Sequence, residues 1–238
     1  MRQVALNTHI SGKFNTELEN LRNSVLTMGG EVEQQLIDTL KAIRTNNAGL
    51  AEKVVLNDLK INSMEIQIDE ECLRIIAKRH PTASDLRMIM TISKAITDIE
   101  RMGDEIERIA RLVTKNKLPA SKSIQSSMLL IGERVVAMMR GTFDALARQD
   151  EQSALQVYEQ DNRIDREYKR LLTYTTEEME RSSEGMQDWL EILWALRSLE
   201  RIGDRCKNLC EYVVSLTRGQ DVRHMPLENM QQKIENLS

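Results

Sequence analysis

Ala95-Ile96-Thr97-Asp98-Ile99-Glu100-Arg101-Met102-Gly103-Asp104 is repeated further along the chain as Ala195-Leu196-Arg197-Ser198-Leu199-Glu200-Arg201-Ile202-Gly203-Asp204. The two copies are 100 residues apart (203 − 103), and five of their ten positions are identical. Such self-similarity indicates that the chain contains two copies of one structural unit. Each copy places a glutamate and an aspartate four residues apart, which puts both carboxylates on one face of a helix.

The composition of the 238-residue chain favours long helices. Aromatic residues make up only 3% of it, so Leu, Ile, Val, Ala and Met must fill the core, and three Pro and ten Gly leave few helix breaks. The net charge of −4, without a basic block, argues against a nucleic-acid-binding protein. The polar N-terminus and the lack of a long apolar run predict neither a signal peptide nor a membrane span. We expect Cys72, Cys206 and Cys210 to be free core thiols in a reducing cytoplasm.

Apolar residues recur every three or four positions through most of the chain, and no stretch alternates as a strand does. We therefore predict an all-α fold of two tandem, sequence-related three-helix bundles, elongated because a helix of ~30 residues is about 45 Å long. The six predicted helices cover approximately residues 10–43, 50–79, 82–116, 120–148, 152–181 and 186–218.

Proline and glycine set the predicted boundaries. Pro81 ends the second helix, Thr82 or Ser84 caps the third, and Gly219 caps the C-terminal end of the sixth. The predicted units are residues 1–117 and 118–220, followed by a tail, residues 221–238, with a short helix after Pro226.

Carboxylates lie beside the apolar stripes of the third and sixth helices. Glu100 and Asp104 flank the third-helix stripe, and Glu200 and Asp204 flank that of the sixth. Like charges at this spacing repel each other by roughly 0.2–0.5 kcal/mol, so we expect a cation nearby.

The second and fifth helices match each other at an offset of 103 residues (161 − 58). This match relates Asp58 and Asn62 to Asp161 and Asp165, which also lie at the edge of an apolar stripe. Polar groups so close to a core require a partner. Asn62 lacks the carboxylate that Asp165 supplies in the second half, so the first half either has no such site or has one that differs from the second.

Folding each hairpin at its turn brings these acids to one level. Asp58 and Asp104 lie equally far from Pro81 in the sequence, one before it and one after it, and the same is true of Asn62 and Glu100. Inward carboxylates on facing helices resemble the metal sites of helical bundles, and oxygen donors suit Mg²⁺, Mn²⁺ or iron. The candidate metal ligands are Asp58, Glu100, Asp104, Asp161, Asp165, Glu200 and Asp204.

Ion pairing is the alternative use of the same acids. Arg108 and Arg111 lie four residues after Asp104 and Glu107, and exposed pairs of this kind contribute little stability. Further arginines lie near Glu200 and Asp204 at positions 197, 201 and 205. Gly103 and Gly203, at the centre of the stripes, predict a close approach of two helices.

The chain resembles the PhoU family of phosphate-signalling regulators. The resemblance is carried above all by the two Glu-Arg-X-Gly-Asp copies, and by four further stretches. These are His9–Leu18, Met28–Gln35, Ile68–Arg87 and Gly219–His224. It covers nearly the whole chain.

The resemblance implies a non-enzymatic, cytoplasmic negative regulator of the phosphate-starvation response. Its expected partners are the phosphate-sensing histidine kinase PhoR and the transporter ATPase subunit PstB, so it meets membrane complexes only through partners, and a homodimer is expected. Some family members bind metal through acidic motifs, which here map to Glu100/Asp104, Glu200/Asp204 and Asp161/Asp165, with magnesium, manganese, iron or zinc as candidate cofactors. The fourth motif, Asp58/Asn62, has lost one carboxylate.

Two rival functions follow from the same residues. A ferritin-like di-metal enzyme needs Glu-X-X-His on inward helix faces, but the three histidines, His9, His80 and His224, do not lie beside the acids. No phosphate-binding glycine loop or nucleophilic triad is visible either. A structural tether, whose acids only solvate the bundle, is the second rival.

Overall fold

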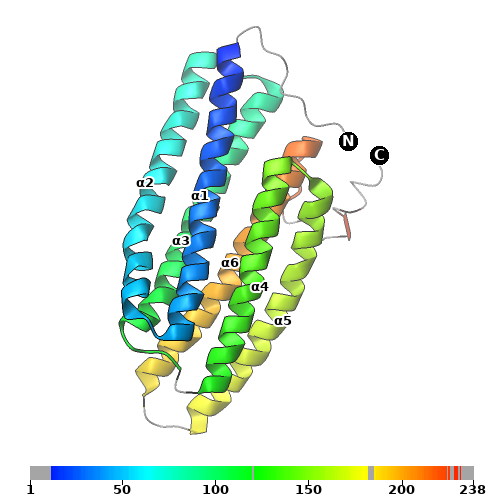
Figure 1. Ribbon diagram of the computed structural model, residues 1–238. Helices are drawn as coiled ribbons and strands as arrows, with labels where there is room; N and C mark the ends of the chain where they lie inside the picture. Colours follow the sequence, from blue (N-terminus) through cyan, green and yellow to red (C-terminus); the bar gives the residue numbers. More distant parts are fainter. Residues whose placement is uncertain are drawn as a thin grey trace.

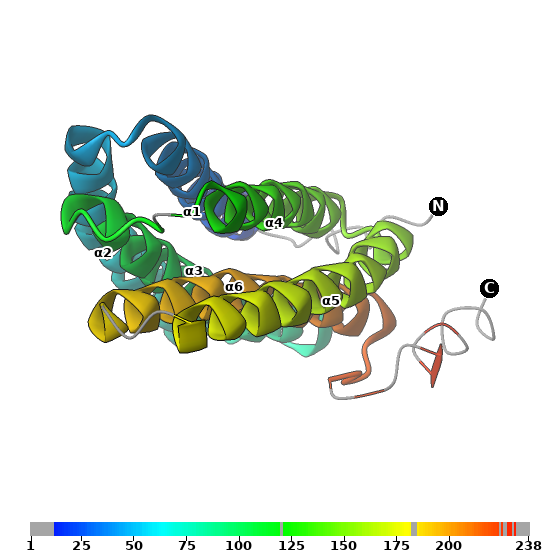
Figure 2. The same cartoon turned by 90° about the horizontal axis from the view of Figure 1, so that it is seen from below.

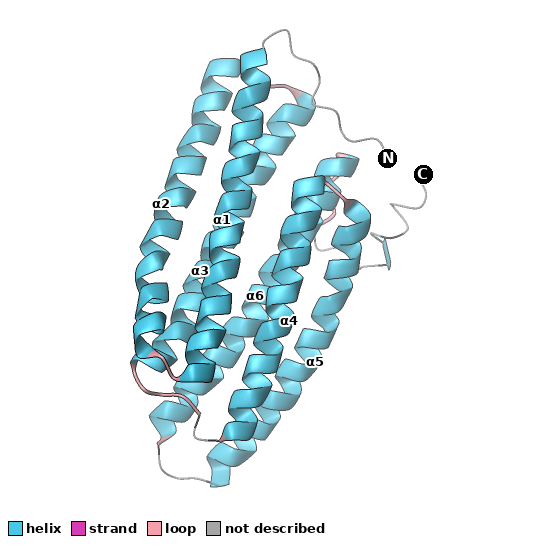
Figure 3. Ribbon diagram, in the orientation of Figure 1, coloured by secondary structure: helices cyan, strands magenta, loops and turns pink. Residues whose placement is uncertain are grey.

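The computed structural model describes residues 12–119, 121–181, 185–223, 225, 228–229 and 231, and these contain six long helices and no strand (Figure 3). The helices are α1 (Gly12–Thr45), α2 (Ala48–Arg79), α3 (Ala83–Thr114), α4 (Lys122–Arg148), α5 (Glu151–Arg181) and α6 (Met186–Arg218). The predicted all-α fold is therefore confirmed. The predicted start of the first helix, near Ile10, and most of the predicted tail helix lie outside the described residues.

The helices begin and end for local reasons. Asn47 caps α2 by accepting a hydrogen bond from the backbone N–H of Leu50. The helix α2 ends at Arg79, which confirms the predicted stop before Pro81, and His80 follows in the left-handed conformation (φ 48°). Gly219 ends α6 at φ 72°, which confirms it as a C-cap. Thr82 occupies the N-cap position of α3 but makes no side-chain capping bond.

Two groups of three helices lie side by side along their long axes (Figure 1). α1, α2 and α3 pack on one another, as do α4, α5 and α6. The end-on view shows that the two bundles meet in two places, where α1 packs on α4 and α3 packs on α6 (Figure 2). The buried apolar side chains form one cluster that runs through both bundles, so each bundle completes the core of the other.

The α1–α4 contact repeats itself about a pseudo-twofold axis. A Cβ atom on Gly29 would lie 2.8 Å from the ring of Phe143, and a Cβ on Gly132 would lie 2.4 Å from Leu40 Cδ2. Gly132 lies 103 residues after Gly29, and Phe143 lies 103 residues after Leu40. The two contacts therefore use equivalent positions of the two halves, with the roles of α1 and α4 exchanged. A Cβ at either glycine would force the facing Phe143 or Leu40 side chain to shift, so glycine lets the two helices pack as closely as they do.

A buried polar network joins α3 to α6 at the second contact. Asp98 is 4% exposed and accepts hydrogen bonds from Arg205 (3.1 Å), Asn208 (3.3 Å) and Tyr212 (2.9 Å). Near the other end of the contact, Glu105 accepts from Ser198 at 2.5 Å. Arg201 and Arg108 also contact Glu105. A saturated carboxylate of this kind fixes the register of the two bundles.

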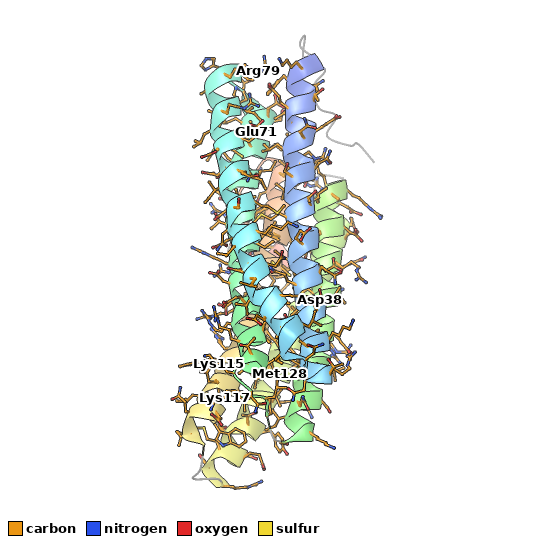
Figure 4. The ribbon with its side chains drawn as sticks, turned by 60° about the vertical axis from the view of Figure 1, so that its left-hand side comes forward. Asp38, Glu71, Arg79, Lys115, Lys117 and Met128 are labelled. Atoms are coloured by element: carbon orange, nitrogen blue, oxygen red, sulfur yellow. The ribbon has the colours of Figure 1, made fainter. Side chains whose placement is uncertain are left out.

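The end of α3 is tied to the start of α6 by two lysines on the loop after α3. Lys115 contacts Glu191 at 3.1 Å and Lys117 pairs with Asp188, near the lower end of the molecule in Figure 4. At the opposite end, Arg79 binds Glu17 of α1 through two hydrogen bonds of 2.8 and 3.0 Å (Figure 4). Both ends of the first bundle are therefore fastened by ion pairs.

The fold also tests the prediction about the three cysteines and places the two tryptophans. Cys72, Cys206 and Cys210 are buried and free, as predicted. Trp189 packs against the core, whereas Trp194 is 53% exposed. In the described part of the chain, no helix is both long and apolar enough to cross a membrane.

Candidate functional site

The register of α2 against α3 follows the predicted count from Pro81. Ser93 donates a hydrogen bond to Asp69 at 2.9 Å, and the two residues lie equally far from Pro81 in the sequence. Thr97 donates to Glu65 at 3.1 Å in the same register. The same register places Asn62 opposite Glu100 and Asp58 opposite Asp104, one and two helical turns further from Pro81. The prediction that these acids share one level of the hairpin is therefore confirmed for the first half.

The first acidic cluster consists of Asp58, Asn62, Glu100 and Asp104. Asn62 Nδ2 donates to Asp58 Oδ2 at 3.3 Å. Asp58 Oδ1 and Asn62 Oδ1 are buried and have no hydrogen-bond partner among the described residues. Gly103 makes room for the aspartate, since a Cβ there would lie 3.3 Å from Asp58 Oδ1. The predicted close approach at Gly103 is confirmed, and what approaches is a carboxylate.

Burial and mutual repulsion raise the pKa values of the first acidic cluster. Burial, followed by the charges of Asp104, Glu65 and Asp58, raises the pKa of Glu100 to about 7. Burial is also the main cause that raises the pKa of Asp58 and of Asp104. Protons and cations therefore compete for this cluster near neutral pH.

The second acidic cluster consists of Asp161, Asp165, Glu200 and Asp204. Asp161 is 2% exposed, and its Oδ1 would lie 2.9 Å from a Cβ placed on Gly203, so this glycine too admits a carboxylate. Asp161 Oδ1 and Glu200 Oε2 have no described hydrogen-bond partner. The cluster therefore repeats the geometry of the first at the corresponding level of α5 and α6.

Lys207 supplies the second acidic cluster with a cation of its own. Its Nζ lies 2.9 Å from Asp161 Oδ2 and 3.6 Å from Asp204 Oδ1. Burial lowers the pKa of Lys207, but the hydrogen bond and charge of Asp161 outweigh burial, so the pKa is raised and the lysine stays protonated. Burial raises the pKa of Asp161 despite this lysine, and burial together with Asp204 raises the pKa of Glu200.

The two clusters differ most at the position that holds Lys207. Its equivalent in the first half, 100 residues earlier, is Glu107, which pairs with Arg111. Sequence reasoning overlooked Lys207, although aligning the two copies three residues beyond the repeated motif would have found the exchange of Glu for Lys. The first acidic cluster is thus short of positive charge, and the second carries its own.

The predicted local ion pairs are corrected in part. Glu107 pairs with Arg111 and Glu200 with Arg197, as predicted. Arg108 binds Glu105 rather than Asp104. The other two arginines, Arg201 and Arg205, reach across to Glu105 and Asp98 on α3 instead of Glu200 and Asp204. Both arginines bind acids of α3 that are buried and would be costly to leave without a positive partner.

The donor chemistry of the first acidic cluster fits a hard cation. It offers carboxylate and amide oxygens, two of them buried without partners, in a surrounding that disfavours bare negative charge. Within the described residues, however, no group of three or more His, Cys, Asp or Glu side chains is already arranged to hold a metal ion. A cation would have to draw the carboxylates together.

The fold defines a class of protein: a fused pair of three-helix bundles, each with an acidic motif at one level. The model of the PhoU domain matches residues 25–113 and again residues 128–213. The chain belongs to the PhoU family.

Two relatives illustrate how far the similarity extends. The phosphate-specific transport system accessory protein PhoU of Serratia marcescens is 44% identical over 225 residues, covering 94% of this chain and 93% of that protein. The crystal structure of PhoU from Pseudomonas aeruginosa is 44% identical and superposes with a TM-score of 0.82, covering 87% of this chain and all of that one. A Streptococcus pneumoniae structure, named phosphate transport system regulatory protein PhoU, gives 0.80 at 27% identity, with 88% and 99% of the two chains covered.

Proposed function

We propose that this protein is a cytoplasmic accessory regulator of phosphate-specific transport, which keeps the phosphate-starvation response off when phosphate is plentiful. The observation that carries the proposal is the full-length similarity to proteins named as accessory to phosphate transport. In this reading the protein has no reaction of its own. It acts as an adaptor between the transporter ATPase subunit PstB and the histidine kinase PhoR.

The fused bundles suit an adaptor. A protein that binds one state of a kinase better than another shifts the kinase between those states by its differential affinity. Such a protein must hold its two binding surfaces in a fixed relation. The network around Asp98 and Glu105 and the glycine contacts of α1 with α4 supply that rigidity.

Recovery of both partners tests the adaptor proposal. The affinity-tagged chain is retrieved from membranes of phosphate-replete cells, and the ATPase subunit and the kinase are quantified by mass spectrometry. Recovery of both supports the adaptor, and recovery of neither sinks it. A control with Asp98→Ala, which loosens the joint between the bundles, should reduce joint recovery more than recovery of either partner alone.

A cation bound at the acidic clusters is a second part of the proposal. We infer that Mg²⁺, Mn²⁺, iron or zinc binds the first acidic cluster more tightly than the second, because Lys207 already neutralises Asp161. The ligands would be Asp58, Glu100 and Asp104 in the first cluster, and more weakly Asp161, Asp165, Glu200 and Asp204 in the second. The ion would supply charge neutralisation, and its occupancy would tune partner binding.

Elemental analysis of the dialysed protein tests the cation proposal. Glu100→Ala/Asp104→Ala should remove most of the bound metal, and the matched Glu200→Ala/Asp204→Ala variant should remove little. Equal losses would contradict the unequal clusters. If none of the three proteins contains metal, the cation proposal is wrong, and the acids only solvate the bundle, as in the structural tether.

Self-association is the third part of the proposal. Leu59, Ile66 and Leu73 are 70%, 59% and 61% exposed and lie seven residues apart on the outer face of α2. An antiparallel second copy would set Ile66 against itself and Leu59 against Leu73, which is the isologous arrangement of a twofold dimer. The fold does not require apolar residues at these three positions of α2, because the equivalent positions of α5 hold polar residues, Asn162, Lys169 and Thr176.

Sedimentation of the purified protein tests the dimer. Three side chains a copy are fewer than a standard interface uses, so we expect dissociation in the micromolar range. Leu59→Asn/Leu73→Thr, which copies the α5 residues, should give a monomer at concentrations where the natural chain is dimeric. A dimer unaffected by this variant would place the interface elsewhere.

A further inference from the structure

Two stretches that carry the family resemblance take no part in the acidic clusters or in the joint between the bundles. One ends at Arg87, early in α3, and the other is residues 219–223, after α6. They meet at a surface hollow of about 200 Å³, although they lie in different halves of the chain. The helices that bring them together, α3 and α6, are in direct contact (Figure 2).

The hollow has an excess of positive charge. Arg87 and Lys94 lie two turns apart on α3, and neither forms an ion pair with a carboxylate of the described residues. Arg223 also lines the hollow and binds Asp221 at 2.9 and 3.0 Å. Three cations thus face one carboxylate and the negative end of α6, which is equivalent to about half a charge, so an excess remains.

The residues that line the hollow divide into committed and free groups. Tyr212 donates its hydroxyl to Asp98 at 2.9 Å, so it is not available to a ligand. Arg87 lies directly over Gly219, where a Cβ atom would come within 2.5 Å of its guanidinium, so the glycine lets the cation reach the loop. The Thr91 hydroxyl lines the same hollow and makes no hydrogen bond to another described residue. The uncommitted groups are therefore donors: a guanidinium, an ammonium and a hydroxyl.

We propose that this hollow binds a phosphoryl dianion, either free orthophosphate or a phosphate monoester. The planar guanidinium of Arg87 supplies the two parallel donors that phosphate oxygens accept. Lys94 adds a point charge from the next turns of α3, and Thr91 a neutral donor. A dianion matches the excess charge better than a carboxylate does.

The second half of the chain shows that the fold does not require these cations. The residues 100 positions after Arg87 and Lys94 are Gln187 and Trp194, and neither is charged. A pair of cations present in one copy only points to a task of that copy. The proposed site goes beyond the adaptor function and does not depend on it.

Calorimetric titration of the whole purified chain in low-salt chloride buffer tests the site, with inorganic phosphate and, separately, O-phosphoserine as ligands. The natural chain should bind one equivalent, and Arg87→Gln/Lys94→Gln should bind about a hundredfold more weakly, tenfold for each lost charge-assisted contact. The matched control Arg170→Gln/Lys169→Gln, which removes two exposed cations from α5, should change the affinity less than twofold.

The two ligands separate the two sources of the phosphoryl group. Tighter binding of inorganic phosphate supports a free anion, and tighter binding of O-phosphoserine supports a phosphorylated partner. Absence of saturable binding to either, or an equal loss in the control variant, overturns the proposal. Arg87 lies against Gly219 at the C-terminal end of α6, so its replacement could disturb the fold, whereas Lys94 makes no such contact. The single variant Lys94→Gln should therefore retain the fold and still bind about tenfold more weakly. No kinase or transporter is present in this measurement, so its failure would leave the adaptor proposal intact.

Discussion

Asp98 of α3 accepts a hydrogen bond from Arg205 of α6 at 3.1 Å, and the same relation recurs with the halves exchanged, where Ser198 donates to Glu105 at 2.5 Å. Each residue of the second pair is 100 positions from its counterpart in the first. The duplicated unit thus uses one pair of positions twice, with different chemistry, to join its two copies. The adaptor proposal depends on this joint being rigid.

We expect Asp98→Ala to lower the free energy of unfolding by about 2–4 kcal/mol, because it leaves the half-buried donors of Arg205, Asn208 and Tyr212 without their acceptor. Urea denaturation measures this loss. Asp144→Ala, which removes an exposed aspartate of α4, is the control and should change stability by no more than about 0.5 kcal/mol. If Asp98→Ala lowers the free energy of unfolding no more than Asp144→Ala does, the hydrogen bonds between α3 and α6 contribute nothing to stability.

The glycines of the acidic motif should respond unequally to alanine. A Cβ atom at Gly203 would lie 2.9 Å from a nearly inaccessible carboxylate oxygen of Asp161, so Gly203→Ala should cost about 1–3 kcal/mol. Gly103→Ala meets its aspartate at 3.3 Å and also gains helix propensity, so we expect a smaller cost. Gly30→Ala, with open space around it, should stabilise the protein by about 0.5–1 kcal/mol. Thermal unfolding ranks the three, and a reversed order would refute the close approach at Gly203.

Lys207→Gln removes the positive charge that faces Asp161. We expect a loss of about 2–4 kcal/mol at pH 7.5, since a buried carboxylate without its cation is costly. The loss should shrink as the pH falls, because the pKa of Asp161 is already raised by burial and protonation removes the charge. Adding Asp161→Asn should restore most of the stability. If the double variant is no more stable than Lys207→Gln, the two residues do not interact as described.

Glu100 gives the first acidic cluster its own pH dependence. Its pKa is about 7 in the folded protein and 4.5 otherwise, so the folded state holds the extra proton between these values and stability falls as the pH rises from 4.5 to 7. Glu100→Gln should therefore stabilise the protein at pH 8, by about 1 kcal/mol after screening by solvent, and leave it unchanged near pH 4.5. Urea denaturation at the two pH values measures this. An equal effect at both would mean that the carboxyl titrates normally.

Much of the fold could be predicted from the sequence because its signals are local. The periodicity of apolar residues, Pro81 and Gly219 give the helices and their ends, and counting residues from Pro81 gives the register that Ser93 and Asp69 display. What could not be predicted is how the two bundles meet. The contacts of Gly29 with Phe143 and of Gly132 with Leu40 join segments from different halves of the chain, and no local pattern reports such a pairing.

The positions of the acids in the candidate site could be predicted from the sequence, but the cations that pair with them could not. Spacing alone brings the acids of α2 and α3 to one level, as it does those of α5 and α6. Which arginine serves which acid depends on the packing of α3 against α6, so Arg201 and Arg205 were assigned to the wrong carboxylates. The difference between Glu107 and Lys207 was visible in the sequence, but its importance depends on the 2.9 Å contact with Asp161.

The most direct test of the proposed function measures a phosphate-starvation reporter in cells that lack this protein and grow with ample phosphate. We predict that the reporter is switched on in these cells and that the natural chain, supplied from a plasmid, switches it off again. A reporter that stays off without the protein, or stays on when the folded protein is restored, would contradict the regulatory account.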